Sequence, residues 1–176
     1  MEQINSKDFY QSAMRYGTYL GIAWALMYIF LFNGITSPLL LLIGMGLFCS
    51  SPFIAGKFVI RHHKSTCNGP VSYMQIWIFL SCMYLCASLL STATNYIYLY
   101  CIDEGNLFSQ ADLILSEIAK DPNINAAELE NLKASRLFLS QLTIQDFTWE
   151  ILKNNILNCF ILPPVIATFV KKKITR

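Results

Sequence analysis

The sequence predicts an all-α, polytopic membrane protein with four transmembrane helices and a helical extracytoplasmic cap between spans three and four. Charged residues make up 14% of the 176 residues, whereas apolar residues make up 55%. A soluble domain carries about 25% charged residues. No Asp, Glu, Lys or Arg occurs within residues 16–56, 65–102 and 154–170, and such runs exceed what the core of a 20 kDa domain needs. A disordered chain, a nucleic-acid-binding module and an ordinary soluble enzyme are therefore disfavoured.

The first charge-free run is long enough for two spans. A helix that crosses the hydrocarbon needs about 20 mainly apolar residues. The turn signal Asn33-Gly34 breaks the run, and Ser37 with Pro38 has the pattern of an N-cap followed by a first helical residue. We expect spans at about 16–32 and 38–60. No cleavage pattern of small residues follows the first span, so we expect it to be a membrane helix rather than a signal peptide.

The third and fourth spans follow from the other two runs. Ser72 with Gln75 forms a capping-box pattern and predicts a span over about 72–100, longer than the hydrocarbon requires. The last run is short, and it predicts a span over about 148–170 if the helix starts near Ile144 with Thr143 as its cap. We treat residues 1–176 as a single membrane domain.

The polar segment of about 103–145 predicts two short helices. Ser109 is a candidate cap for the first helix, and Asn125 with Glu128 is a second capping signature. We expect the pair to fold back as a cap over spans three and four. The pair serves either as a structural connector or as a ligand- or partner-binding cap.

The basic residues predict the orientation. Nine of the thirteen Lys and Arg residues fall in the N-terminal segment, the 60s loop and the C-terminal segment, whereas residues 103–153 hold the other four together with nine acids. Basic residues near span ends stay in the cytoplasm, so both termini are expected there. The topology determinants are Arg15, Lys57, Arg61, Lys64, Lys171, Lys172 and Lys173.

Small residues recur every four positions along span one and predict a helix-packing face. They are Ala13, Gly17, Gly21 and Ala25. Small residues on one face let another helix approach closely. Packing within the chain is one interpretation, and a homodimer contact is the other.

A polar stripe lies along span three, at positions that share a narrow arc of the helix. It consists of Ser81, Ser88, Thr92 and Asn95. Such a stripe either hydrogen-bonds neighbouring helices or lines a polar pathway. Ion-coupled transport usually needs an ionisable group deep in the membrane, and no span has one there.

No catalytic, cofactor or metal site is predicted. His62 and His63 with Cys67 match no strong zinc pattern and are typical of a solvated inner loop. The sequence contains no nucleophile elbow, P-loop, HExxH motif or paired carboxylates. We therefore expect no enzyme, and the six cysteines imply no disulfide framework.

Three short motifs carry a family resemblance. Arg15-Tyr16-Gly17 opens the first span, Gly69-x-Val71-Ser72-Tyr73 opens the third, and Lys171-Lys172-Lys173 ends the last. In these motifs the chain resembles a Bacteroidetes family of small four-span membrane proteins that is catalogued only as a domain of unknown function. The resemblance implies a bacterial inner-membrane location and supplies no activity or functional residues.

These observations favour a non-catalytic packing, accessory or assembly component of the bacterial envelope. Its partners are expected to be the lipid bilayer and either a second copy or another envelope protein, with no nucleic acid. A small oligomeric transporter or pore is the alternative, with the polar stripe as its lining. A membrane enzyme that acts on lipid is the third hypothesis.

Overall fold

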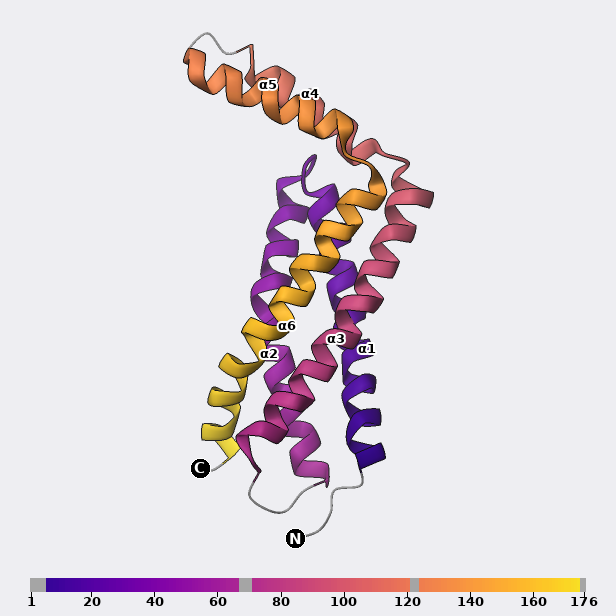
Figure 1. The fold of residues 1–176 in the computed structure, drawn as a ribbon, viewed down its shortest axis with the longest axis vertical. Coiled ribbons are helices and arrows are strands. Elements are labelled where there is room, and N and C mark those ends of the chain that lie inside the picture. The colour runs from indigo at the N-terminus through magenta and orange to yellow at the C-terminus, as the bar shows by residue number, and fades with distance from the viewer. Residues whose placement is uncertain (1–5, 67–70, 121–123, 175–176) are drawn as a thin grey trace.

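The chain folds into α-helices alone. A computed structural model describes residues 6–66, 71–120 and 124–174, and within these ranges it has six α-helices and one π-helical turn (Figure 1). In chain order they are α1 (Ser6–Asn33), α2 (Pro38–Thr66), α3 (Tyr73–Tyr98), the π-helical turn η1 (Leu99–Asp103), α4 (Asn106–Ile118), α5 (Ala126–Gln141) and α6 (Ile144–Ile174).

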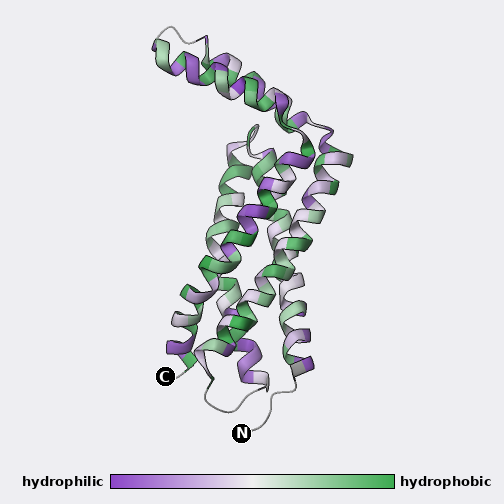
Figure 2. Ribbon diagram, viewed as in Figure 1, coloured by the Kyte–Doolittle hydropathy of each residue, from purple (hydrophilic) through white to green (hydrophobic). Residues whose placement is uncertain are grey.

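Four of these helices are long and apolar enough to cross a membrane. They are α1, α2, α3 with η1, and α6. Each is longer than its predicted span, because the helix continues past the apolar run into polar residues at its ends. Figure 2 shows apolar residues along the bundle and hydrophilic residues concentrated toward its two ends. The fold class predicted from the charge-free runs is confirmed.

Helix α3 lies at the centre of the bundle. Its contacts with α1 are the most extensive in the molecule, and those with α6 come next. The core therefore forms around side chains of α3, including Phe79, Leu80, Met83 and Tyr84, each at most 1% exposed. Among the four long helices α2 is the least buried, and Leu39, Leu42 and other large apolar side chains on it face outward. An apolar exterior is what a lipid-facing surface requires.

Local signals set most of the helix starts. Helix α2 begins at Pro38, as predicted, and α5 begins after Asn125, whose side chain accepts a hydrogen bond of 2.8 Å from the Glu128 amide. Helix α6 begins at Ile144, where the Asp146 amide donates to Thr143 Oγ1 at 3.1 Å. The backbone amide of Ser72 donates to Gln75 Oε1 at 3.1 Å before α3.

The predicted cap at Ser109 is wrong. The cap of α4 is Gly105, four residues earlier, because Glu104 and Gly105 both adopt the left-handed conformation and reverse the chain after η1. Asp103 then accepts a hydrogen bond of 2.9 Å from the Leu107 amide, and Ser109 lies inside the helix. Glycine adopts this conformation without steric cost.

The α4–α5 pair lies between spans three and four in the chain, but it does not pack down over them. In Figure 1 the two helices form a hairpin that projects obliquely from one end of the bundle. Only the base of the hairpin is anchored, through the buried Leu107, and α5 has no buried residue. The two short helices predicted from the sequence therefore form. The prediction that they fold back over spans three and four is wrong, because only the base of the hairpin contacts the bundle.

Candidate functional site

The polar stripe of α3 lies mostly in the bundle interior. Ser88 and Asn95 are fully buried and Thr92 is nearly so, whereas Ser81 is half-buried. Ser91, which the sequence analysis did not include, is also fully buried beside them. The serine hydroxyls donate to carbonyls of the preceding turn, Ser88 to Leu85 at 2.9 Å and Ser91 to Ser88 at 3.2 Å.

Asn95 and Thr92 have polar atoms without partners. Neither the amide nitrogen nor the amide oxygen of Asn95 has a hydrogen-bond partner in the described part of the chain, and the same holds for Thr92 Oγ1. A buried polar group without a partner costs roughly 1–3 kcal/mol. This part of α3 therefore does not contribute stability through its polar groups.

A second polar pair joins α1 to α6 at the same level. The Tyr28 hydroxyl donates to Asn155 Oδ1 at 2.8 Å. Phe32, Leu99 and Ile151 belong to one buried cluster near the hairpin. Each of these three apolar residues has a polar residue four positions, or about one helical turn, farther from the hairpin on the same helix. These polar residues are Tyr28, Asn95 and Asn155. We call these three residues the polar layer.

The outer side of the polar layer is closed by packed apolar groups. Phe32, Leu99, Ile151 and Leu107 are each at most 8% exposed and form one cluster. Phe147 packs against this cluster, with its ring centroid 5.9 Å from that of Phe32. The polar layer therefore has no open route to the hairpin end in this conformation.

A small cavity of about 120 Å³ opens beside the polar layer between α1, α2 and α6. Trp24, Tyr28, Ser51 and Asn155 line its polar part, and the Trp24 indole donates to Ser51 Oγ at 2.7 Å. The Asn155 amide nitrogen has no hydrogen-bond partner among the residues that the structure describes. The cavity offers hydrogen bonds but no charged group, so it is not suited to ion or proton coupling.

The polar residues of the other helices near the stripe were not predicted from the sequence. Tyr28 and the neighbouring Ser50 and Ser51 form no stripe along their helices, whereas Asn155 belongs to a group with Asn154 and Asn158, of which Asn158 also lines the cavity. The available signal was the position of Asn155 inside the charge-free run 154–170, where polar side chains are expensive and usually face the bundle interior.

The small-residue face of α1 lies against α3. A Cβ on Gly17 would come within 2.7 Å of the Met83 carbonyl oxygen, and one on Gly21 within 3.1 Å of Ala87. Ala13 is fully buried and Ala25 is 5% exposed. Within one chain this face is therefore covered by α3 and is not free for a second copy.

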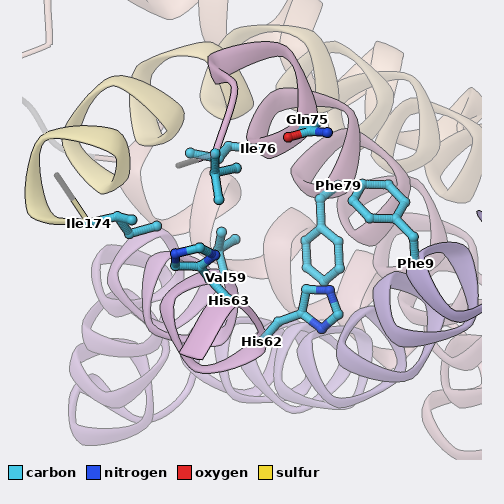
Figure 3. A pocket seen from close by; sticks show the side chains of 9 residues that line it. Phe9, Val59, His62, His63, Gln75, Ile76, Phe79 and Ile174 are labelled. Carbon is cyan, nitrogen blue, oxygen red and sulfur yellow. The ribbon is translucent and has the colours of Figure 1, made fainter. Parts of the chain in front are cut away.

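The two histidines line a separate small cavity at the opposite end of the bundle from the hairpin. The cavity measures about 30 Å³, and Phe9, Val59, Ile76 and Ile174 share its walls with His62 and His63 (Figure 3). The His62 ring stacks on Phe79 with a centroid separation of 4.6 Å. These contacts are those of aromatic packing, and Cys67, the third residue of the sequence cluster, lies outside the described residues.

The basic residues gather at this same end. The beginnings of α1 and α3 and the ends of α2 and α6 lie together there, opposite the hairpin (Figure 1). Arg15, Lys57, Arg61, Lys64 and the three lysines 171–173 are all exposed. Residues of the acidic segment, including Asp103 and Asp146, lie toward the hairpin end.

The described residues hold no group of three or more His, Cys, Asp or Glu side chains able to bind a metal ion. The five described cysteines are free thiols. The interior therefore presents hydroxyl, indole and carboxamide groups, which can form hydrogen bonds.

Comparison with known proteins gives a family and no activity. Residues 15–172, nearly the whole chain, match the family described as Protein of unknown function (DUF4199). The chain belongs to this family. No curated protein matches the chain. No solved structure matches it either. The resemblance expected from the three motifs is thus supported as a family of unknown function with four candidate membrane helices, and its taxon remains a prediction.

Proposed function

We propose that this chain is a non-catalytic accessory or assembly component of a bacterial inner-membrane complex, with the basic end and both termini in the cytoplasm. The distribution of Lys and Arg between the two ends supports the orientation. The hydrogen-bonding but uncharged interior supports a structural role. In this orientation the α4–α5 hairpin stands outside the cytoplasm.

The observation that carries the proposal is the uncovered apolar surface of the hairpin. Five large apolar side chains on α4 and α5 are at least 40% exposed: Leu113, Ile114, Ile118, Leu137 and Phe138. The hairpin projects beyond the apolar part of the bundle (Figure 2), so the bundle does not cover these side chains. Contiguous apolar surface outside the membrane marks an interaction site. A partner protein of the envelope fits this surface.

A purification experiment tests the proposal. The tagged chain is isolated in mild detergent, and a stoichiometric partner is expected to follow it. The double variant Leu137→Ser/Phe138→Ser removes two exposed apolar groups and should reduce the recovered partner at least about tenfold. Glu130→Ser/Lys133→Ser is the matched control, because it changes two exposed polar residues of the same helix at no net change in charge.

A photo-reactive residue in place of Phe138 identifies what covers the hairpin. An adduct with one protein supports the proposal. Adducts with lipid alone, or equal partner recovery from both double variants, would show that the hairpin rests on the bilayer surface and would overturn it.

A small oligomeric transporter or pore is the second candidate. The observation that favours it is the set of unpartnered polar atoms on Asn95 and Thr92. The double variant Ser88→Ala/Thr92→Ala separates the two functions. An accessory component should keep its partner in this variant, whereas a pore lined by the stripe should change its solute flux in reconstituted vesicles.

A further inference from the structure

A groove lined by basic residues lies between the ends of α2 and α6 at the basic end of the bundle. It measures about 510 Å³ and is open to the outside. Its lining residues are Lys57, Ile60, Arg61, Lys64, Ser65 and Lys173. Among the described residues, no Asp or Glu lines it. Asp8, which lies near this end, belongs to α1, and α1 does not line the groove.

Helices α2 and α6 are in contact deeper in the bundle than the groove. A Cβ on Gly56 would lie 3.4 Å from Val170 and 3.7 Å from Ile166, which is ordinary van der Waals contact, so the two helices lie side by side at this level. The basic side chains of α2 begin at Lys57, the residue after Gly56, and continue one turn later with Arg61. Lys173 comes from α6 and the other three cations come from α2, so the groove is assembled from two helices.

The cations of α2 form a column whose length matches the headgroup region of a bilayer leaflet. Lys57, Arg61 and Lys64 are spaced i, i+4 and i+7 and share one face of α2. They rise about 10 Å along the helix, at 1.5 Å per residue. The polar region of one leaflet is roughly 5–8 Å thick. The column is therefore long enough to extend from the edge of the hydrocarbon through the level of the phosphates.

An exposed phenylalanine lies one turn deeper than a groove lysine on each helix. Phe53 precedes Lys57 by four residues and is 74% exposed, and Phe169 precedes Lys173 by four and is 71% exposed. Residues four apart lie on the same face of a helix. Each wall of the groove thus places a cation toward the water and an apolar ring toward the acyl chains.

We propose that this groove binds the phosphate group of an anionic phospholipid, with the acyl chains against Phe53 and Phe169. Basic pockets between membrane helices on the cytoplasmic side bind anionic lipid headgroups. Arg61 offers a planar fork for two phosphate oxygens, and the lysines supply point charges. The groove is thus a lipid site in addition to a determinant of orientation.

Native mass spectrometry of the full-length chain in neutral detergent tests the proposal. Phosphatidylglycerol is titrated in parallel with phosphatidylcholine. We expect one phosphatidylglycerol to stay bound per chain and phosphatidylcholine to be lost. Arg61→Gln/Lys173→Gln should weaken phosphatidylglycerol binding at least about tenfold. Lys7→Gln/Lys172→Gln is the matched control, because it removes the same charge from the same end outside the groove and should bind normally.

Two further measurements keep the outcome clear. The thermal unfolding of both double variants in neutral detergent should match the wild type, and Arg61→Lys/Lys173→Arg should restore most of the binding. Equal losses in the groove and control variants would indicate attraction to charge in general and overturn the site. Displacement of the lipid by 10 mM inorganic phosphate would make a soluble phosphate the ligand and overturn the assignment to a lipid.

Discussion

Gly17 has no room for a side chain, whereas Gly46 has open space beside it, although both lie inside membrane helices. A Cβ on Gly17 would meet the Met83 carbonyl oxygen at 2.7 Å and Cys86 Cβ at 2.8 Å, whereas one on Gly46 would meet nothing within 4 Å. The first glycine is therefore required by the contact between α1 and α3. The second is not required by any contact with the described part of the chain.

Replacement of each glycine by alanine tests this contrast. Gly17→Ala forces α1 and α3 apart, and we expect the free energy of unfolding in detergent to fall by about 1–3 kcal/mol. Gly46→Ala should leave it unchanged or raise it by up to about 1 kcal/mol, because alanine favours the helix. Chemical or thermal unfolding followed by circular dichroism measures both. If Gly17→Ala were as stable as the wild type, the close approach of the two helices would be incorrect.

Asn95 and Tyr28 belong to the same polar layer, yet the structure predicts opposite effects of removing their polar groups. Asn95→Leu removes two buried polar atoms that have no partner and replaces them with a side chain of similar shape, so stability should be unchanged or increased. Tyr28→Phe leaves the Asn155 oxygen without its donor and should cost about 1 kcal/mol. The same unfolding assay compares them, with the exposed Tyr100→Phe as the neutral control. A marked loss of stability in Asn95→Leu would show that Asn95 does have a partner.

At the scale of single elements, an ion pair links the two helices of the hairpin. Arg136 of α5 contacts Asp112 of α4 through Nε at 2.7 Å and through Nη2 at 2.9 Å. The hydrogen bond from Arg136 lowers the pKa of Asp112 below its ordinary value of 3.8. A carboxyl group whose pKa is lower in the folded state stabilises that state above its ordinary pKa. The contribution is thus full at neutral pH and is lost as the pH falls through the lowered pKa.

The variant Asp112→Asn should loosen the hairpin at neutral pH. Because the two side chains are 41% and 43% exposed and water screens the pair, we expect amide hydrogen exchange in α4 and α5 to accelerate only a few-fold, with no change in the four long helices. Glu117→Gln on the same helix is the control and should exchange like the wild type. In the wild type the same loosening should appear on acidification below pH 3.8. Equal exchange in Asp112→Asn and Glu117→Gln at neutral pH would mean that the ion pair does not hold the hairpin.

Whether an element was predictable from sequence depended on the range of the forces that define it. Charge-free runs and caps such as Thr143–Asp146 are local, so the long helices and most of their starts could be predicted. The start of α4 depends on the left-handed Glu104 and Gly105, which reverse the chain, and the serine at 109 gave a misleading local signal. The direction of the hairpin and the contact between Tyr28 and Asn155 depend on residues far apart in the chain, which a single sequence does not pair.

For the whole molecule, the two ends differ in both charge and shape. The basic end gathers cations of α2 and α6 in an open groove, whereas the other end has the acidic segment and a projecting hairpin with exposed apolar side chains. The middle is a packed bundle around α3 with an uncharged interior. The parts suited to binding are therefore at the two ends, one suited to phosphate groups and one suited to a protein surface.

The orientation of these ends can be measured directly by cysteine labelling in spheroplasts. Ala127 is exposed on α5 and, unlike Asn125, does not cap the helix, so Ala127→Cys is a suitable outer probe. The exposed Cys101 near the hairpin end is first replaced by alanine to remove its signal. An impermeant thiol reagent should label Ala127→Cys in intact spheroplasts and reach the native Cys67 only after permeabilisation, because the proposed orientation places the basic end in the cytoplasm. Labelling of Cys67 in intact spheroplasts, with Ala127→Cys protected, would place the basic groove outside and reverse the orientation proposed for the chain.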